Sequence, residues 1–127
     1  MTVAIGTDIV EIERIAKVFE RQGERLLKRV LTFSELNRCE QLKGDQNKIQ
    51  FLAKRWAAKE AIAKALGTGI AKGVGFQQME IHNNELGAPL ITLTDGALER
   101  LTDLGAKKAL ISISDERHYA VAFCTLI

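Results

Sequence analysis

The chain has 127 residues, of which 46% are apolar and 27% are charged, and its formal net charge is +2. This composition suits one globular domain and excludes a disordered chain. No apolar run approaches the roughly 18 residues of a membrane span, and the N-terminal segment lacks the features of a signal peptide. Cys39 and Cys124 are isolated, so we expect reduced thiols in a cytoplasmic protein that does not bind membranes.

A strand is predicted over residues 2–10, because apolar and small residues alternate there. Val3, Ile5, Thr7 and Ile9 share one face, and the other face, which is small and open, carries Ala4, Gly6 and Asp8. Aspartate is depleted in strands. Asp8 is therefore either a cap at the strand end or a ligand for a bound group.

An amphipathic helix begins near residue 11 or 12 and is interrupted at Gly23, after which the apolar pattern resumes as far as Leu31. If this helix continued through Gly23, five basic residues would share an arc of about 80°: Arg14, Lys17, Arg21, Arg25 and Lys28. A solvated basic face is one interpretation. A nucleic-acid-binding module is another, although Glu20 and Glu24 dilute the stripe and no aromatic residues are interleaved with it.

Thr32 or Ser34 caps a second predicted helix that runs to about residue 42, and residues 43–47 read as a polar loop. A long helix then covers residues 51–66 and ends at Gly67, which is placed for a left-handed cap. Glu60 lies at the edge of the apolar side of this helix, one turn before Lys64. A lone acid among bases suits a place where a cation and a phosphate are both held.

Asp8 and Glu60 are the candidate metal ligands. Mg²⁺ is commonly held by one or two carboxylates together with substrate phosphates, and no Cys/His set is present for structural zinc. The alternative is a helix-surface salt bridge between Glu60 and Lys64. Lys64 could otherwise contact the same phosphate and offset developing charge.

The second half reads as a hairpin of strands over residues 76–82 and 89–94, a short helix over 96–104, and strands over 109–114 and 119–127. The last strand is apolar on both faces, so we expect both faces to be covered, one of them by another subunit. About five strands and four helices without strict alternation indicate an α+β fold, with helices packed on a mainly antiparallel sheet in a single domain.

Two separated segments resemble the holo-[acyl-carrier-protein] synthases, the small bacterial 4′-phosphopantetheinyl transferases. One is Ile5-Gly6-Thr7-Asp8-Ile9-Val10-Glu11-Ile12. The other matches the family's helix motif at Trp56, Ala57, Lys59, Glu60, Ala61, Lys64, Ala65, Gly67, Thr68 and Gly69. Residues 84–89 and 112–120 also fit, so the resemblance covers essentially the whole chain.

The resemblance implies transfer of the 4′-phosphopantetheine arm from coenzyme A to a serine of apo-acyl carrier protein, releasing adenosine 3′,5′-bisphosphate, in support of fatty acid biosynthesis. It implies that Asp8 and Glu60 hold Mg²⁺, although two carboxylates alone do not distinguish Mg²⁺ from Mn²⁺. Lys64 would contact the diphosphate, and Glu60, Asp8 and Lys64 are all candidates to remove the serine proton. The coenzyme A site would be lined by Arg55, Lys64, Gly67, Thr68, Gly69 and Pro89.

The same resemblance implies a homotrimer with active sites between subunits. Acyl carrier proteins are small and acidic, and a basic helix face would steer them into place. The predicted docking residues are Arg14, Lys17, Arg21, Arg25 and Lys28. No nucleic-acid partner is expected, and an enzyme-like scaffold without activity is disfavoured by the intact Asp8, Glu60 and Lys64.

Overall fold

The computed structural model describes residues 1–127. The elements follow the chain in the order β1 (Ala4–Glu11), α1 (Ile12–Gln22), α2 (Glu24–Val30), α3 (Phe33–Glu40), α4 (Asp45–Leu66), the 3₁₀ turn η1 (Phe76–Gln78), β2 (Met79–Asn83), β3 (Pro89–Leu93), α5 (Asp95–Asp103), β4 (Ala109–Asp115) and β5 (Tyr119–Leu126). The predicted α+β class is confirmed, with most helices early and most strands late.

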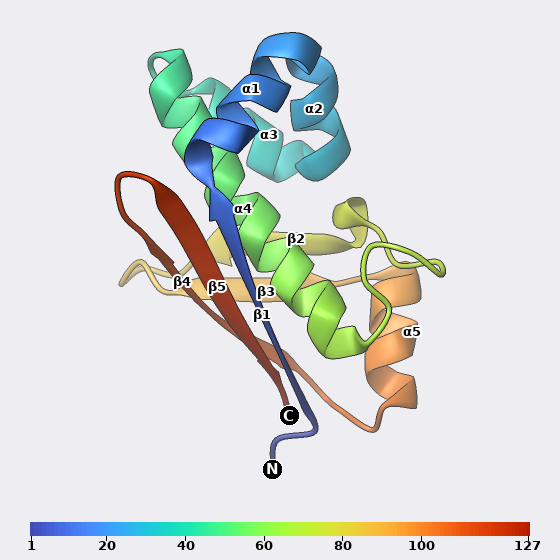
Figure 1. The fold of residues 1–127 in the computed structure, drawn as a ribbon. Coiled ribbons are helices and arrows are strands. Elements are labelled where there is room, and N and C mark those ends of the chain that lie inside the picture. The colour runs from blue at the N-terminus through green and yellow to red at the C-terminus, as the bar shows by residue number, and fades with distance from the viewer.

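The strands form two antiparallel sheets instead of the one sheet expected. β1, β5 and β4 lie side by side in that order, whereas β2 and β3 form a separate hairpin. In the larger sheet Asp8 pairs with Ala122, and Ala4 pairs with Leu126. Helix α4 crosses one face of this sheet, α1, α2 and α3 gather around its N-terminal part, and α5 lies beside its C-terminal part (Figure 1).

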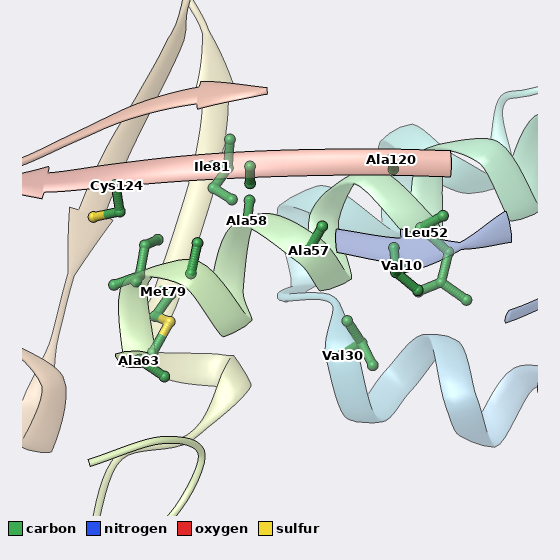
Figure 2. Packing of buried hydrophobic residues seen from close by; sticks show 14 of the residues in the cluster. Val10, Val30, Leu52, Ala57, Ala58, Ala63, Met79, Ile81, Ala120 and Cys124 are labelled. Atoms are coloured by element: carbon green, nitrogen blue, oxygen red, sulfur yellow. The ribbon is translucent and has the colours of Figure 1, made fainter. Parts of the chain in front are cut away.

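The core fills the space between α4 and the larger sheet. Figure 2 shows Ala57 and Ala58 on the side of α4 that faces β5, which carries Ala120 and Cys124, whereas Ala63 lies on the opposite side of the helix near Met79. All of these residues are completely buried. Small side chains on both elements let helix and sheet approach closely, so the dispersion contacts that stabilise the fold are dense here.

Gly6 marks the closest approach of β1 to α4. A Cβ atom built on Gly6 would lie 2.6 Å from the backbone nitrogen of Ala65 and closer still to the carbonyl oxygen of Ala61. No side chain fits in that space. The face of β1 that carries Ala4, Gly6 and Asp8 is therefore packed against a helix, and the expectation that it is open was wrong.

The opposite face of the larger sheet is uncovered in the single chain. Tyr119, Val121 and Phe123 of β5 are exposed, together with Ile5 and Ile9 of β1. The pairing of Ile9 with Val121 makes these side chains neighbours on one surface. The expectation that both faces of the last strand are covered thus holds for only one face within the chain, and the other is a contiguous apolar surface.

The first helix does not continue through Gly23. That residue has φ 54° and ψ −128°, and the chain changes direction there between α1 and α2. Because the predicted stripe required one helix, it is divided: Arg14, Lys17 and Arg21 are on α1, and Arg25 and Lys28 are on α2. All five side chains are exposed. Because the first helix is divided in two, the chain has five α-helices, where four had been expected.

Other boundaries moved by a few residues. Helix α4 begins at Asp45, so the polar loop expected over residues 43–47 is partly its first turn. It ends as predicted, with Gly67 left-handed at φ 80°. Residues 76–78 form η1 instead of the start of a strand. Thr32, rather than Ser34, caps α3. None of the helices is long and apolar enough to cross a membrane.

Candidate active site

The structure brings Asp8 of β1 and Lys64 of α4 into direct contact. The Lys64 ammonium donates a hydrogen bond to Oδ1 of Asp8 at 3.0 Å. The side chain of Asp8 is 15% exposed and that of Lys64 is 53% exposed, so the pair is at the surface and open to a ligand from one side. The alternative of a Glu60–Lys64 salt bridge is not what forms, because Lys64 pairs with the strand instead.

Glu60 completes the group one turn before Lys64. Partial burial raises the pKa of Glu60, the negative charge of Asp8 raises it further, and Lys64 partly opposes both effects. Two carboxylates therefore share a region of reduced solvation with a single ammonium. A positive ligand placed between them would lower the free energy of their ionised state.

Packing of β1 on α4 holds these groups together. Gly6 precedes Asp8 by two residues on the strand and therefore lies on the same face. Ala61 and Ala65, which contact Gly6, each follow a site residue directly, namely Glu60 and Lys64. The separation of the two acids is consequently set by backbone contact and not by flexible side chains.

The residue set fits a hard divalent cation with few protein ligands. Nowhere in the structure do three or more His, Cys, Asp or Glu residues come together as a metal-binding group. Mg²⁺ commonly accepts one or two carboxylates and takes its remaining ligands from substrate oxygens and water. Asp8 and Glu60 match that demand, and a site made entirely of protein ligands does not exist here.

A cavity of about 460 Å³ opens beside the two acids, between α1, α2 and α4. It is lined by Asp8 and Glu60, by the basic residues Arg14, Arg21 and Arg29, and by a group that includes Val10, Ile15, Val18 and Trp56. Two of the predicted docking residues, Arg14 and Arg21, therefore reach the same cavity as the predicted metal ligands. Arg29 was not predicted; its guanidinium lies 5.8 Å from the Trp56 ring centre, close enough for cation–π attraction.

The predicted coenzyme A residues are not gathered at this cavity. Arg55 lines a second cavity of about 440 Å³, together with Arg38 and Lys54. Pro89 lines a third, beside His82. Within one chain, Arg55 and Pro89 therefore lie away from the candidate metal ligands, whereas Lys64, which is also predicted for the coenzyme A site, contacts Asp8.

The Gly67-Thr68-Gly69 segment has its polar groups engaged already. The N–H of Gly67 donates to Lys64 O at 3.0 Å, and those of Thr68 and Gly69 donate to Ala63 O at 3.3 and 3.1 Å. The Thr68 hydroxyl donates to Gly69 O at 2.8 Å. These bonds satisfy the helix end, so the N–H groups and the hydroxyl hydrogen of this segment are used within the chain, and its place in the coenzyme A site stays a prediction.

Sequence reasoning also missed a buried ionic cluster. Lys59 is 0% exposed and pairs with Glu35, which is 2% exposed, at 2.6 Å. Burial lowers the pKa of Lys59, and the negative charge of Glu35 opposes that shift. Two signals in the sequence pointed to it: Glu35 stands three residues after the Thr32 cap, and Lys59 lies one turn after Arg55.

A family model described as the 4′-phosphopantetheinyl transferase superfamily matches residues 4–124. The chain belongs to this superfamily. The resemblance found in the sequence is thereby confirmed, and so is the prediction that the protein is an enzyme of the transferase class.

Relatives within the superfamily cover nearly the whole chain. The holo-[acyl-carrier-protein] synthase of Shewanella amazonensis is 57% identical over 122 residues, which is 96% of this chain and 95% of that protein. The solved structure of holo-[acyl-carrier-protein] synthase from Neisseria meningitidis is 38% identical, has a TM-score of 0.89, and covers 100% of this chain and 99% of that one. The Helicobacter pylori enzyme, solved in complex with coenzyme A, is 34% identical with a TM-score of 0.82, over 97% and 99% of the two chains.

Proposed function

We propose that the protein transfers the 4′-phosphopantetheine arm of coenzyme A to a serine of apo-acyl carrier protein, releasing adenosine 3′,5′-bisphosphate, in support of fatty acid biosynthesis. The observation that carries this proposal is the convergence of Asp8, Glu60 and Lys64 beside a basic cavity. The names of the superfamily relatives supply the carrier protein, and the complex of the Helicobacter pylori enzyme supplies coenzyme A.

The chemistry explains these residue types. The serine hydroxyl attacks the β-phosphorus of the coenzyme A diphosphate, and the bond from that phosphorus to the bridging oxygen breaks. No covalent enzyme intermediate is required, so the work of the protein is positioning and charge neutralisation. Lys64, held by Asp8, presents an exposed ammonium for a phosphate oxygen. Asp8 and Glu60 would hold Mg²⁺, which when bound supplies positive charge against the diphosphate.

Docking of the carrier protein is proposed for the exposed basic residues of α1 and α2. Arg14 and Arg21 line the cavity that contains the two acids, so an acidic partner bound there would bring its serine to the site. Lys17, Arg25 and Lys28 extend the positive surface without lining the cavity. Attraction between this surface and an acidic partner would raise the association rate and fix the register of docking.

Coenzyme A binding is proposed for the cavity that contains Arg55, with Pro89 nearby on β3. Arg38, Lys54 and Arg55 give this cavity positive charge suited to a phosphorylated ligand. Gly67, Thr68 and Gly69 would contribute through the shape of the helix end, since their N–H groups are engaged.

We propose a homotrimer with active sites between subunits, as the resemblance implies. Two observations support association. The exposed apolar face of β1 and β5 needs a cover, and the cavity that contains Arg55 is separate from the cavity that contains Asp8 and Glu60 within one chain. A second copy could bring its Arg55 cavity toward the first copy's Asp8. The proposed location is the cytoplasm, where Cys39 and Cys124 would stay reduced, as they are in the structure.

The deciding experiment is incubation of the protein with coenzyme A, Mg²⁺ and apo-acyl carrier protein, followed by mass spectrometry of the carrier. A gain of one phosphopantetheine is expected, and chelation of the metal should prevent it. A carrier of unchanged mass would refute the proposed function. Sedimentation of the protein should give about 42 kDa, three times the 14.1 kDa of the chain, and a 14.1 kDa species would refute the trimer.

A further inference from the structure

Lys59 has all three of its donor hydrogens bound inside the protein. Its ammonium donates to Val30 O at 2.7 Å, to Glu35 Oε1 at 2.6 Å and to Phe76 O at 3.2 Å. One side chain of α4 thus joins the end of α2, the first turn of α3 and the turn η1. Because Lys59 reaches no cavity and no solvent, it contributes to the structure and cannot touch a substrate.

Glu35 accepts three hydrogen bonds and forms an ion pair with a fourth group. Its Oε1 accepts the N–H of Thr32 at 2.9 Å as well as Lys59, and its Oε2 accepts the N–H of Ile81 at 2.8 Å. The Nε atom of Arg55 lies 3.7 Å from Oε2. Glu35 is therefore the only carboxylate in direct contact with two buried cations, Lys59 and Arg55.

Arg55 is held between this carboxylate and the second cavity. Its guanidinium lies 4.5 Å from the centre of the Phe51 ring, and one terminal nitrogen donates to Asn83 Oδ1 at 3.3 Å. Asn83 in turn donates to Gly87 O at 2.9 Å, within the turn between β2 and β3. The Nε atom of Arg55 is buried and makes no hydrogen bond.

The cluster formed by Glu35, Lys59 and Arg55 has an excess of positive charge, and the wall of the neighbouring cavity adds to that excess. Two buried cations contact one carboxylate, and the cavity wall adds the basic residues Arg38 and Lys54, opposed by Glu85. Burial lowers the pKa of Arg55, and Glu35 opposes that shift. Removal of the carboxylate would leave Lys59 and Arg55 repelling each other in a region of low polarity, and Arg55 is the one with an open path outward.

We propose that Glu35 is a positioning residue for the coenzyme A site. It does not touch the ligand; it holds the Arg55 guanidinium in place at the cavity wall and neutralises Lys59 behind it. This inference rests on the proposed function, specifically on Arg55 as a coenzyme A residue. The consequence is that Glu35 controls affinity for coenzyme A while leaving the carrier protein site on α1 unaffected.

Three variants separate positioning from general stability. Glu35→Gln keeps the side-chain volume and removes the charge, and its one oxygen can accept from either the Thr32 or the Ile81 N–H but not from both. Lys59→Met is the matched control, because it disturbs the same cluster yet leaves Glu35 facing Arg55. The double variant removes both charges, so no buried ammonium is left without a partner if Glu35→Gln alone does not fold.

The measurements are the KM values for coenzyme A and for the carrier, kcat, and direct calorimetric binding of coenzyme A without the carrier. We expect Glu35→Gln and the double variant to weaken coenzyme A binding and raise its KM about tenfold, with kcat and the carrier KM within twofold. Lys59→Met should lower Tm but keep the coenzyme A KM within twofold.

An unchanged or lower KM for coenzyme A in Glu35→Gln would overturn the inference, since a lower value would show that Glu35 competes with the ligand for Arg55. Equal increases in Glu35→Gln and Lys59→Met would overturn it too, by revealing general disruption. Calorimetry separates this inference from the proposed function. A wild-type protein that binds coenzyme A but transfers nothing refutes the transfer alone, and the variants' binding constants still decide the role of Glu35.

Discussion

Replacement of Gly6 by alanine adds a single methyl group at the contact between β1 and α4. The new Cβ would lie 2.6 Å from the Ala65 nitrogen and closer still to the Ala61 oxygen, whereas ordinary contacts of this kind exceed about 3.4 Å. Both obstacles are backbone atoms, which cannot rotate away. The helix must therefore move from the strand by about 1 Å to relieve the overlap.

Two effects follow from that displacement. Overpacking of this kind typically costs about 1–3 kcal/mol, which for a chain of this size lowers Tm by about 4–12 °C. The same shift separates Asp8 from Glu60 and Lys64, and a misplacement of about 1 Å at a reacting centre can reduce the rate about 100-fold. We therefore expect Gly6→Ala to lose both stability and kcat/KM.

Two other glycines provide matched controls. A Cβ on Gly96 would come within 3.0 Å of the carbonyl carbon of Gly73 and closer still to its oxygen; Gly96→Ala should lower Tm but leave kcat/KM of the folded protein within twofold. Gly75 has no atom near its Cβ position, so Gly75→Ala should change neither. The assays are thermal unfolding by circular dichroism and transfer of phosphopantetheine at a temperature where each variant is folded. A Gly6→Ala protein with wild-type Tm and kcat/KM would refute the reasoning.

Three further predictions concern the site and the thiols. Glu60→Gln should abolish transfer, and wild-type transfer would remove Glu60 from the site. In metal-free buffer at pH 8 the same variant should raise the free energy of unfolding by about 1 kcal/mol or less after solvent screening. The pKa of Glu60 is raised in the fold, so its contribution to stability is present below the ordinary pKa and lost as pH rises, and no gain is expected at pH 4. Arg14→Glu should raise KM for the carrier about tenfold and KM for coenzyme A less than twofold. Lys107→Glu, an exposed control on another surface, should change neither KM. Equal effects of Arg14→Glu on both KM values would contradict docking at α1. Burial raises the pKa of Cys124 to about 12 and also raises the pKa of Cys39. A thiol reagent at pH 8 should therefore label neither cysteine until denaturant is added. Rapid labelling of the native protein would contradict the buried placement of the two thiols.

Local patterns predicted the individual elements well. Alternation identified β1, a run that is apolar on both faces identified β5, and helical periodicity with Gly67 identified the end of α4. The prediction that Asp8 and Glu60 share a metal site came from two motifs far apart in the chain. In the structure Asp8 contacts Lys64 of α4, and the metal role of the two acids stays a prediction. The patterns could not supply the position of β1 along α4. That position decides that Lys64 pairs with Asp8 and not with Glu60.

The errors have a common physical cause, which is that tertiary contacts decide burial. A lysine on a basic helix is ordinarily solvated, so the sequence assigns Lys59 no role, and only the fold brings Val30, Glu35 and Phe76 around it. The N–H groups of Gly67 and Gly69 are used by the helix end itself. The interruption predicted at Gly23 is confirmed, but the change of direction between α1 and α2 depends on the backbone torsions of that residue, which no periodicity determines.

The pairing of β1 with β5 has a consequence for chain connectivity. Ala4 lies opposite Leu126, so the two ends of the chain emerge side by side, away from α1, α2 and α3 (Figure 1). A short linker could join them, and new ends could be opened in the exposed turn at residues 41–44, before α4. In such a circular permutant all strand pairings and α4 would be retained, and β1 would enter the sheet from the middle of the chain instead of from its beginning.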